Sequence, residues 1–394
     1  MAVEKLKVVD FSTHMSGPLA SQILLQLGAD VVKVENPRVG DGNRGLAPLI
    51  NGVGMFHHAL SSGTRSVAVD RRSPEWKQVV AAAAAWADVV IVGTRPSDAA
   101  RRGMDFATLV KANPNLVYCA ISGYGEAGPW QNITAHGLNP DAFAGLVPVE
   151  WAEGRPAAIP SYQSIGAPLS GVFAALGILA AVRERDHGAG ARYVHCSLWE
   201  SAMWFSWRNL ATIANLGEPW RAYRDLGSRY AMYGTSDHRA ILVCPVERHF
   251  WERFCDLARL PEEWKSVGDW SVSGMYNGSG PEQVEERRQI QARVGERTLA
   301  DWIASLTEAE IPFAPVLTIA EALTSDHAAA NGIMRTESFG GHKVSIPSIP
   351  VRVGSEPGDG LVRGELPSSP RLGGDADSVL TEWGVADHTG RPIA

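Results

Sequence analysis

The feature that most constrains the fold is a regular alternation of β-rich and helical segments over residues 1–125. Short runs rich in valine and isoleucine are separated by segments whose apolar residues recur at helical spacing, as in residues 18–29 and 74–87. Strands that alternate with helices predict a parallel, doubly wound sheet with helices on both faces. The expected strands are residues 6–11, 31–36, 66–70, 88–93 and 116–123.

The remainder of the chain changes character twice. Residues 126–165 contain many prolines and are expected to form loops. Between about residues 225 and 330 the segments ILVCPV, FWERFCDLA, TLADWIASL and PFAPVL indicate a smaller α+β unit, and the tail from residue 331 is rich in glycine, proline and serine. Further expected elements are a helix at 171–185, a strand at 193–198 and a helix at 375–384.

Composition argues against several classes of protein. The net charge is −7 at pH 7 and no basic run is present, so nucleic acid is not an expected partner. No uninterrupted apolar stretch reaches the roughly 18 residues that cross a membrane, and the start of the chain lacks the pattern of a secretory signal, so we expect a cytoplasmic protein. The four cysteines are far apart and form no CxxC motif, which predicts free thiols and no metal site.

One motif that matches a nucleotide-binding pattern is rejected. Residues 123–128 (GYGEAG) follow an expected strand and satisfy GxGxxG. A dinucleotide site requires a helix to begin there, so that its first amides meet the pyrophosphate. Pro129 follows at once and prolines interrupt the next thirty residues, so a nicotinamide-dependent dehydrogenase is not expected.

Several separated segments, in the same order along the chain, resemble the third family of CoA-transferases (CaiB/BaiF type). That family includes formyl-CoA transferase, carnitine CoA-transferase and α-methylacyl-CoA racemase. The first segment contains LGADVVKVE and a GD…R element, and another contains NPNLVYCAISGYGEAGP. The resembling segments are residues 8–44, 65–76, 100–129, 171–202, 232–237, 311–333 and 370–380.

The resemblance implies both a fold and a mode of assembly. The expected fold is an α/β protein with a Rossmann-like large domain, formed by residues 1–205 and 331–394. Residues 206–330 are expected to form a linker and a small inserted α+β domain. Two subunits are expected to interlock as a dimer, with CoA on the large domain and the acyl group facing the partner's small domain. The implied substrates are coenzyme A, as an acyl-CoA, and a carboxylic acid, with no permanently bound cofactor.

The resemblance also assigns residues to the CoA site. Met15 and Ser16 lie where the first turn after a strand approaches CoA, and backbone amides can bind there whatever the side chain. Val69 matches a backbone position beside the adenine. Arg72 and Arg101 match basic contacts, and the fixed fork of donors of a guanidinium suits phosphate. Without the resemblance, each arginine is better interpreted as a solvated surface charge; with it, the two interpretations are about equal.

The family's catalytic aspartate is missing. In a family transferase this carboxylate attacks the donor thioester and becomes an aspartyl-CoA thioester, a role that no aliphatic residue can fill. Counting back from Gly171 places the position at Ala167, and the longer spacing of the racemase branch places it at Gly166. Glu153, in a loop rich in glycine and proline, is a candidate substitute nucleophile. Asp141 also carries a carboxylate, but nothing besides that chemistry favours it for this role.

His136 occupies the position of the catalytic histidine of the racemase branch, although Gly137 replaces the acidic or polar residue that follows in relatives. A histidine near a thioester can abstract an α-proton, because its pKa is near neutrality. Racemisation needs a second group on the opposite face of the substrate, and that group is the missing aspartate. His136 is therefore interpreted either as a base or as a polar wall of the acyl pocket.

Three functional hypotheses remain open. The chain is the aspartate-lacking subunit of a heteromeric CoA-transferase that acts on an aromatic or dicarboxylic acid such as benzylsuccinate, with which the tryptophan cluster at residues 199–207 is compatible. Alternatively, it is a racemase-like or isomerase-like enzyme that uses His136. In the third hypothesis it binds acyl-CoA without catalysis.

Overall fold

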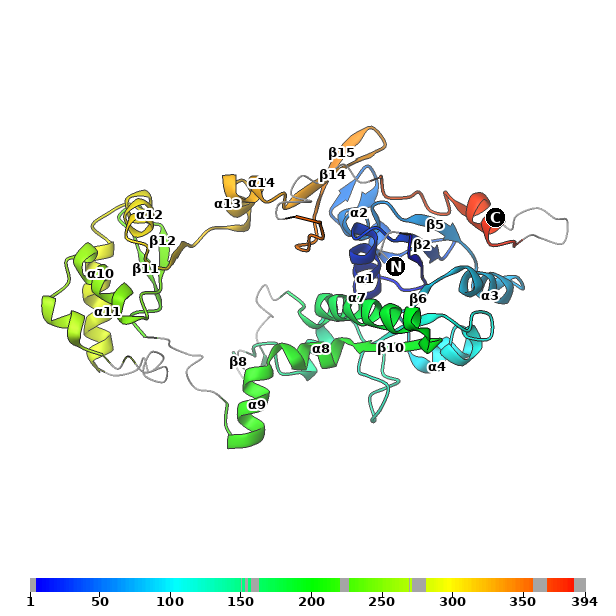
Figure 1. The fold of residues 1–394 in the computed structure, drawn as a ribbon, viewed down its shortest axis with the longest axis horizontal. Coiled ribbons are helices and arrows are strands. Elements are labelled where there is room, and N and C mark those ends of the chain that lie inside the picture. The colour runs from blue at the N-terminus through cyan, green and yellow to red at the C-terminus, as the bar shows by residue number, and fades with distance from the viewer. Residues whose placement is uncertain are drawn as a thin grey trace. The chain divides into compact units, whose positions relative to one another are not determined.

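The computed structural model describes residues 5–149, 151–152, 155–156, 163–219, 227–268, 270, 281–356 and 367–385 (Figure 1). The chain divides into two compact units, one formed by residues 1–207 and 327–394 and the other by residues 208–326.

The larger unit is built around a six-stranded sheet in which every pair of neighbouring strands is parallel. The strand order is β10-β7-β6-β1-β2-β5. The predicted α/β class with a parallel, doubly wound sheet is thus confirmed. The strands are β1 (Lys7–Asp10), β2 (Asp30–Glu35), β5 (Arg65–Ala68), β6 (Val89–Val92), β7 (Val117–Ser122) and β10 (Arg192–Ser197).

Helices cover both faces of this sheet because successive strand residues point to opposite sides. Val9, Val32 and Val90 belong to the core on the face of α3 and α15. Val8 and Val31 belong to the core on the face of α1 and α7, and these two helices pack side by side (Figure 1). The four helices are α1 (Ser16–Gln26), α3 (Trp76–Trp86), α7 (Gly166–Glu184) and α15 (Ala376–Glu382).

Helix α7 begins at Gly166, earlier than the predicted start at residue 171. The sequence pattern missed this turn because it contains Pro168, which the first turn of a helix tolerates. Extended to Ala189, this helix is long and apolar enough by composition to cross a membrane, and half of that stretch is buried. Its buried residues, such as Ala174 and Ile178, pack against α1 and the sheet as in a core helix.

The C-terminal part of the chain returns to the same unit. His58 Nδ1 lies 2.6 Å from Glu337 Oε1 of β14, with both side chains fully buried. The N–H of Ser66 donates to Asp375 Oδ2 at 2.8 Å, which ties the start of α15 to β5. Other elements of this unit are η1 (Gly42–Gly45), β3 (Leu49–Ile50), β4 (Val53–Gly54), α2 (Met55–Ser61), α4 (Pro96–Arg101), α5 (Phe106–Leu109), α6 (Leu138–Phe143), β8 (Trp151–Ala152), β9 (Arg155–Pro156), η2 (Arg185–Ala189), α8 (Leu198–Phe205), α14 (Asp326–Ala330), β14 (Met334–Phe339) and β15 (His342–Pro347). Helix α9 (Trp207–Leu216) begins at the boundary and, apart from Trp207, belongs to the other unit.

The smaller unit has its own core. A three-stranded antiparallel sheet, in the order β11-β12-β13, packs against helices around buried Trp251, Phe254 and Trp302. Arg229 is paired with Glu286 at 2.9 Å, and its guanidinium lies 3.9 Å from the centre of the Trp251 ring. The elements are β11 (Ala231–Gly234), β12 (Ala240–Val243), α10 (Arg248–Ala258), η4 (Glu262–Ser266), α11 (Pro281–Val294), α12 (Leu299–Glu308), β13 (Phe313–Pro315) and α13 (Ile319–Leu323).

Candidate functional site

The strand order reverses direction between β1 and β6, and a cavity lies just beyond their carboxyl ends. In an open α/β sheet, ligands bind in the crevice at this switch point. The cavity has a volume of about 480 Å³. We call it the switch-point cavity; its lining includes Ser12, His14, Met15, Ser16, Thr94, Arg95, Asp98, Ser122, His136, Ala167 and Leu198.

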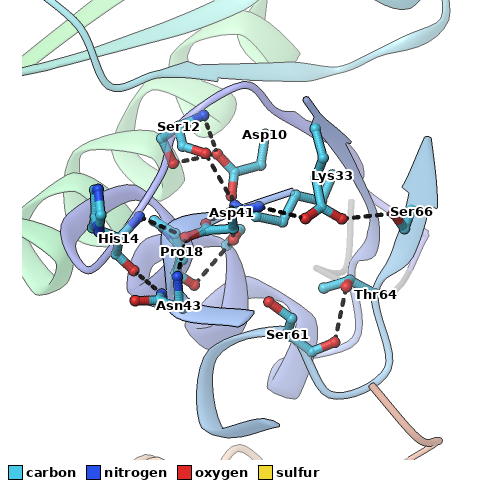
Figure 2. Close-up of polar contacts among 12 residues, drawn as sticks. Asp10, Ser12, His14, Pro18, Lys33, Asp41, Asn43, Ser61, Thr64 and Ser66 are labelled. Atoms are coloured by element: carbon cyan, nitrogen blue, oxygen red, sulfur yellow. Dashed lines mark hydrogen bonds and ion pairs between the residues drawn. The ribbon is translucent and has the colours of Figure 1, made fainter. Parts of the chain in front are cut away.

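A buried ion network supports the loop that forms one wall of the cavity (Figure 2). Lys33 Nζ lies 3.2 Å from Asp10 Oδ2 and 2.9 Å from Asp41 Oδ2, and all three side chains are buried. Burial opposes the charge of Lys33, but the Asp10 and Asp41 carboxylates outweigh it and raise the lysine pKa. The carboxylates also hold the loop, because Asp10 accepts the N–H of Ser12 at 2.7 Å and Asp41 accepts the N–H of His14 at 3.1 Å.

A third buried carboxylate, Glu35, continues this network. It accepts hydrogen bonds from Nε and Nη2 of Arg44, at 2.8 and 2.7 Å, and from Ser66 Oγ at 2.6 Å. Burial alone would raise its pKa, but the bonds to Arg44 and the other donors lower it to about 2. The charges behind this wall are thus paired with one another, which makes the network a scaffold for the loop.

Among the described residues, the wall formed by the start of α7 carries no free charge. Asp141 is fully buried, and its carboxylate accepts the N–H groups of Ile165 and Gly166 at 2.9 and 2.8 Å. Asp141 lies outside α7, and these hydrogen bonds cap the amino end of that helix. Ala167 lines the cavity, and its carbonyl accepts Ser16 Oγ at 2.9 Å, which joins α7 to the start of α1.

The two positions predicted for the missing aspartate differ in their surroundings. A Cβ atom on Gly166 would lie 2.4 Å from the carbonyl oxygen of Leu198 and 2.7 Å from Asp141 Oδ1. That position therefore has no room for a side chain. Ala167 is buried, at 3% exposure, but lines the cavity.

The remaining carboxylate of the described lining is Asp98, and it is already engaged. It is paired with Arg95 at 2.7 Å and also with Arg101. The hydrogen bond from Arg95, together with the charge of Arg101, lowers the pKa of this carboxyl group. An acid held in this way is a weak nucleophile, so the described wall of the cavity offers no carboxylate poised for attack.

The predicted site residues fall into separate groups. Met15, Ser16 and His136 all line the switch-point cavity, and no side chain caps the amino end of α1 beside Met15. His136 is exposed, and its N–H donates to Asn139 Oδ1 at 2.9 Å. Val69 is buried directly after β5, where its N–H donates to the carbonyl of Glu35 at 3.0 Å. Glu153 lies outside the described residues.

Arg72 and Arg101 line a second depression, of about 760 Å³, which we call the basic depression. Arg72 is paired with Asp70 at 3.4 Å and Arg101 with Asp98. Sequence reasoning missed three further cations of the lining, although the doublets at 71–72 and 101–102 were a visible signal. They are Arg71, Lys77 and Arg102.

Positive charge accumulates in the basic depression. Burial and the like charge of Arg102 lower the pKa of Arg71, so the surroundings disfavour the charged form of this guanidinium. An anion bound there would relieve this repulsion, and phosphate groups match the fork of guanidinium donors. Asn36 also lines this depression, and it follows β2 directly, so the depression opens at the carboxyl edge of the sheet.

Aromatic residues from the loop after β7 and from helices α6 and α8 gather beside the switch-point cavity, whose lining includes the neighbouring residues Gly123 and Leu198. Trp130 is stacked on Phe143, with ring centres 4.3 Å apart, and Tyr124 and Trp199 contact Phe143 at 5.8 Å. Trp130 and Phe143 remain 40% and 47% exposed, so this cluster presents flat apolar surface to solvent. The turn at residues 123–128 carries no helix start, since α6 begins only at Leu138.

Within the described residues, no group of three or more histidine, cysteine, aspartate or glutamate side chains is placed to hold a metal ion. The structure is thus an α/β fold with two depressions along the carboxyl edge of its sheet, one of which is lined by several cations. Residues 3–376 match the sequence profile of CoA-transferase family III, and the chain belongs to this family. The predicted family and class of enzyme, a transferase that moves CoA between carboxylic acids, are thereby confirmed.

Individual relatives cover nearly the whole chain. Succinate–glutarate CoA-transferase of Agrobacterium fabrum is 25% identical, over 98% of this chain and 97% of the relative. The alpha and beta subunits of succinyl-CoA–L-malate CoA-transferase of Chloroflexus aurantiacus are 25% and 24% identical, over 90% and 96% of this chain and 83% and 93% of the relatives. An aspartate-to-alanine mutant of Rv3272 from Mycobacterium tuberculosis shares the fold, with a TM-score of 0.79 and 23% identity over 94% of this chain and 96% of that chain.

Proposed function

We propose that this chain is the aspartate-lacking subunit of a heteromeric family III CoA-transferase in the cytoplasm. It binds a CoA thioester, and a homologous chain supplies the aspartate that becomes covalently linked to CoA. The acceptor is an aromatic or dicarboxylic acid such as benzylsuccinate, and the two chains interlock as a heterodimer. The observation that carries this proposal is Ala167, an aliphatic residue at the place where the start of α7 lines the switch-point cavity.

Two features support the remaining parts of the proposal. Relatives named as alpha and beta subunits of one transferase both resemble this chain, which favours a heteromeric arrangement. The exposed, stacked pair of Trp130 and Phe143 beside the cavity favours an aromatic acid, because flat rings bind by stacking. We assign the phosphates of CoA to the basic depression that contains Arg72 and Arg101.

Native mass spectrometry with an acyl-CoA donor tests the proposal. The complex isolated from its source is mixed with succinyl-CoA and then digested to locate covalent CoA. We expect two different chains, with CoA on the homologous chain and none on this one. A homodimer of this chain with full transferase activity, or a CoA adduct on this chain, would overturn the proposal.

The chain also offers a gain-of-function test with a matched control. Ala167→Asp places a carboxylate on the cavity wall, and we expect the variant chain alone to gain a covalent CoA adduct with succinyl-CoA. Gly166→Asp is the control, because its side chain would collide with the carbonyl of Leu198. If both variants, or neither, acquired the adduct, the assignment of Ala167 to the vacant position would be wrong.

The racemase-like alternative rests on His136, which lines the switch-point cavity and is exposed. It predicts exchange of deuterium from solvent into the α-carbon of an acyl-CoA, and the loss of that exchange in His136→Ala. The absence of exchange over hours with several thioesters would remove this alternative.

The alternative of a non-catalytic acyl-CoA binder rests on the basic depression alone. It predicts CoA binding without turnover, which Arg101→Ala should weaken by about 10-fold, since a hydrogen bond to a charged group contributes about 1.5–3 kcal/mol. Lys111→Ala, at an exposed position outside the depression, is the control. A chain that fails to bind CoA at all would contradict this alternative and the assignment of the depression.

A further inference from the structure

Ser122, His195 and Glu200 form a polar chain at the rim of the switch-point cavity, and the proposed function uses none of them. Ser122 Oγ lies 3.0 Å from Nε2 of His195. Nδ1 on the other side of the imidazole ring lies 3.9 Å from Oε2 of Glu200, within ion-pair reach. A serine hydroxyl, an imidazole and a carboxylate in this order are the elements of an activated nucleophile.

The topology of the sheet brings these residues together. Strands β7 and β10 are parallel neighbours, with Ala120 opposite His195 and Ser122 opposite Ser197. Since alternate residues share a face, the side chains of Ser122 and His195 lie on the same side of the sheet. Ser197 then caps α8 by accepting the N–H of Glu200 at 3.0 Å and donates to its carboxylate at 2.5 Å, which aims that carboxylate.

Ser122 also lies between two cavities. It lines the switch-point cavity and a second cavity of about 280 Å³. The wall of this second cavity is largely apolar and aromatic, with Phe106 5.3 Å from Tyr193 and Tyr118 stacked on Tyr193 at 5.5 Å. A thioester with the sulfur end of its CoA moiety in the first cavity would thus have a mostly apolar space for its acyl group on the other side of Ser122, although Asp105 and Glu126 also line that space.

We propose that Ser122 and His195, positioned by Glu200, hydrolyse CoA thioesters of aromatic or other apolar acids. The proposal shares with the proposed function only the binding of an acyl-CoA. Ser122 Oγ bonds to the thioester carbonyl carbon, its proton passes to His195 Nε2, and the carbon–sulfur bond breaks as that proton moves to the CoA sulfur. Water then gives a proton to His195 as its oxygen bonds to the acyl carbon, and the bond from that carbon to Ser122 Oγ breaks as His195 returns the proton to Oγ. The products are the free acid and CoA.

The local hydrogen bonds are consistent with this role. The N–H of Gly125 donates to Ser122 Oγ at 3.0 Å, which leaves the serine proton available for the imidazole and would stabilise developing negative charge on the oxygen. The side chain of His195 is 19% exposed and that of Glu200 is 55% exposed, so water can reach the site. The 3.9 Å between His195 Nδ1 and Glu200 Oε2 is longer than a hydrogen bond and must shorten for Glu200 to position the ring. Contacts in empty catalytic sites often shorten in this way when substrate binds.

The main experiment uses the purified chain alone, without a partner chain or an acceptor acid. Release of the CoA thiol is followed with benzoyl-CoA, phenylacetyl-CoA and succinyl-CoA, and a fluorophosphonate probe is used to label an activated serine. We expect hydrolysis of the two aromatic thioesters and labelling of Ser122, mapped by peptide mass spectrometry. No hydrolysis and no labelling of Ser122 would overturn the proposal.

Variants separate a chemical role from a structural one. Ser122→Ala and His195→Asn should each reduce hydrolysis at least about 100-fold, the usual effect of losing acid–base or nucleophilic catalysis. Ser378→Ala and His187→Asn, at exposed positions, should leave it unchanged. Because Ser122 also accepts a bond within its turn, labelling of the unaltered protein provides the readout that does not depend on variant folding. Unchanged hydrolysis in a folded His195→Asn variant would contradict the assignment.

Glu200 is a positioning residue, so its test needs a different readout. Glu200→Gln keeps the shape of the side chain and removes its charge, and we expect kcat to fall about 10-fold with KM unchanged. A rise of about 10-fold in KM with kcat unchanged would contradict this role.

Ala107→Trp, on the wall of the second cavity, should raise KM for benzoyl-CoA and not for acetyl-CoA. An unchanged KM for benzoyl-CoA would overturn the placement of the acyl group.

The outcome is independent of the proposed transferase. Hydrolysis requires only water and this chain, whereas CoA transfer requires an acceptor acid and covalent CoA on the homologous chain. A complex that transfers CoA while the chain alone neither hydrolyses aromatic thioesters nor reacts with the probe would refute the hydrolytic centre and leave the transferase intact.

Discussion

Two walls of the switch-point cavity use buried charge in opposite ways. Behind the loop after β1, Asp10, Lys33 and Asp41 are paired with one another, and the ions are fixed by mutual contacts. At the start of α7, the one buried carboxylate, Asp141, is bound to backbone N–H groups, and the residue facing the cavity is Ala167. The difference teaches that mutual pairing of buried ions fixes the first wall, whereas backbone hydrogen bonds fix the second wall and leave an aliphatic residue facing the cavity.

The largest expected effect comes from breaking the ion network. Lys33→Met leaves Asp10 and Asp41 buried without their shared cation, and removal of one partner from a buried ion pair typically costs about 3–5 kcal/mol. Urea denaturation should show this loss in the free energy of unfolding, whereas the exposed Lys111→Met should change it little. A loss below about 1 kcal/mol would mean that the network does not hold this wall.

The next effect is a dependence of stability on pH from His57, which is fully buried beside the same network. Burial, together with the charge of Arg44, lowers its pKa from 6.5 to about 4. Between these values the unfolded chain binds a proton that the folded chain does not, so the free energy of unfolding falls as pH falls. The full loss from pH 6.5 to 4 is about 3 kcal/mol, at about 1.4 kcal/mol per pKa unit.

Denaturation curves at several pH values check this dependence. His57→Leu should flatten the slope between pH 6.5 and 4, while His187→Leu, at an exposed position, should keep it. The lowered pKa of Glu35 acts at more acidic pH, below 4.5, so the two contributions occupy different windows. An unchanged slope in His57→Leu would show that another group carries the effect.

A smaller effect is expected at the second wall. Gly166→Ala adds a methyl group 2.4 Å from the carbonyl of Leu198, and overpacking of this kind costs about 1–3 kcal/mol. Ala167→Gly, one residue further along the helix, should cost only about 1 kcal/mol from lost helix propensity. Thermal unfolding of the two variants compares them directly, and equal losses would contradict the assignment of the tight contact to Gly166.

The smallest effect tests the role of Asp141. Asp141→Ala removes the acceptor of the Ile165 and Gly166 N–H groups, and loss of a helix cap costs about 0.5–2 kcal/mol. Asp377→Ala, in the exposed first turn of α15, is the matched control. Hydrogen exchange of the first turn of α7 should increase in the first variant alone; a turn that stays protected would mean that Asp141 does not cap it.

Sequence reasoning succeeded where the information is local. Valine-rich strands and helical spacing of apolar residues predicted the parallel sheet, since each signal needs only neighbouring residues. It did not find Lys33 as the partner of Asp10, because the two residues lie on different strands and are 23 positions apart in the sequence. Arg71 and Arg102 were missed for the same reason, since they meet only when the ends of β5 and α4 are side by side.

By itself, the sequence determined the class of fold, the family and the absence of an aspartate near residues 166–167, because these depend on local pattern and residue identity. Only the tertiary structure decided which of the two positions lines the cavity and that Asp141 is committed to capping α7. It alone placed Ser122 beside His195, on neighbouring strands. The physical reason is that burial, pairing and reach are properties of contacts between segments, and these arise only when the sheet assembles.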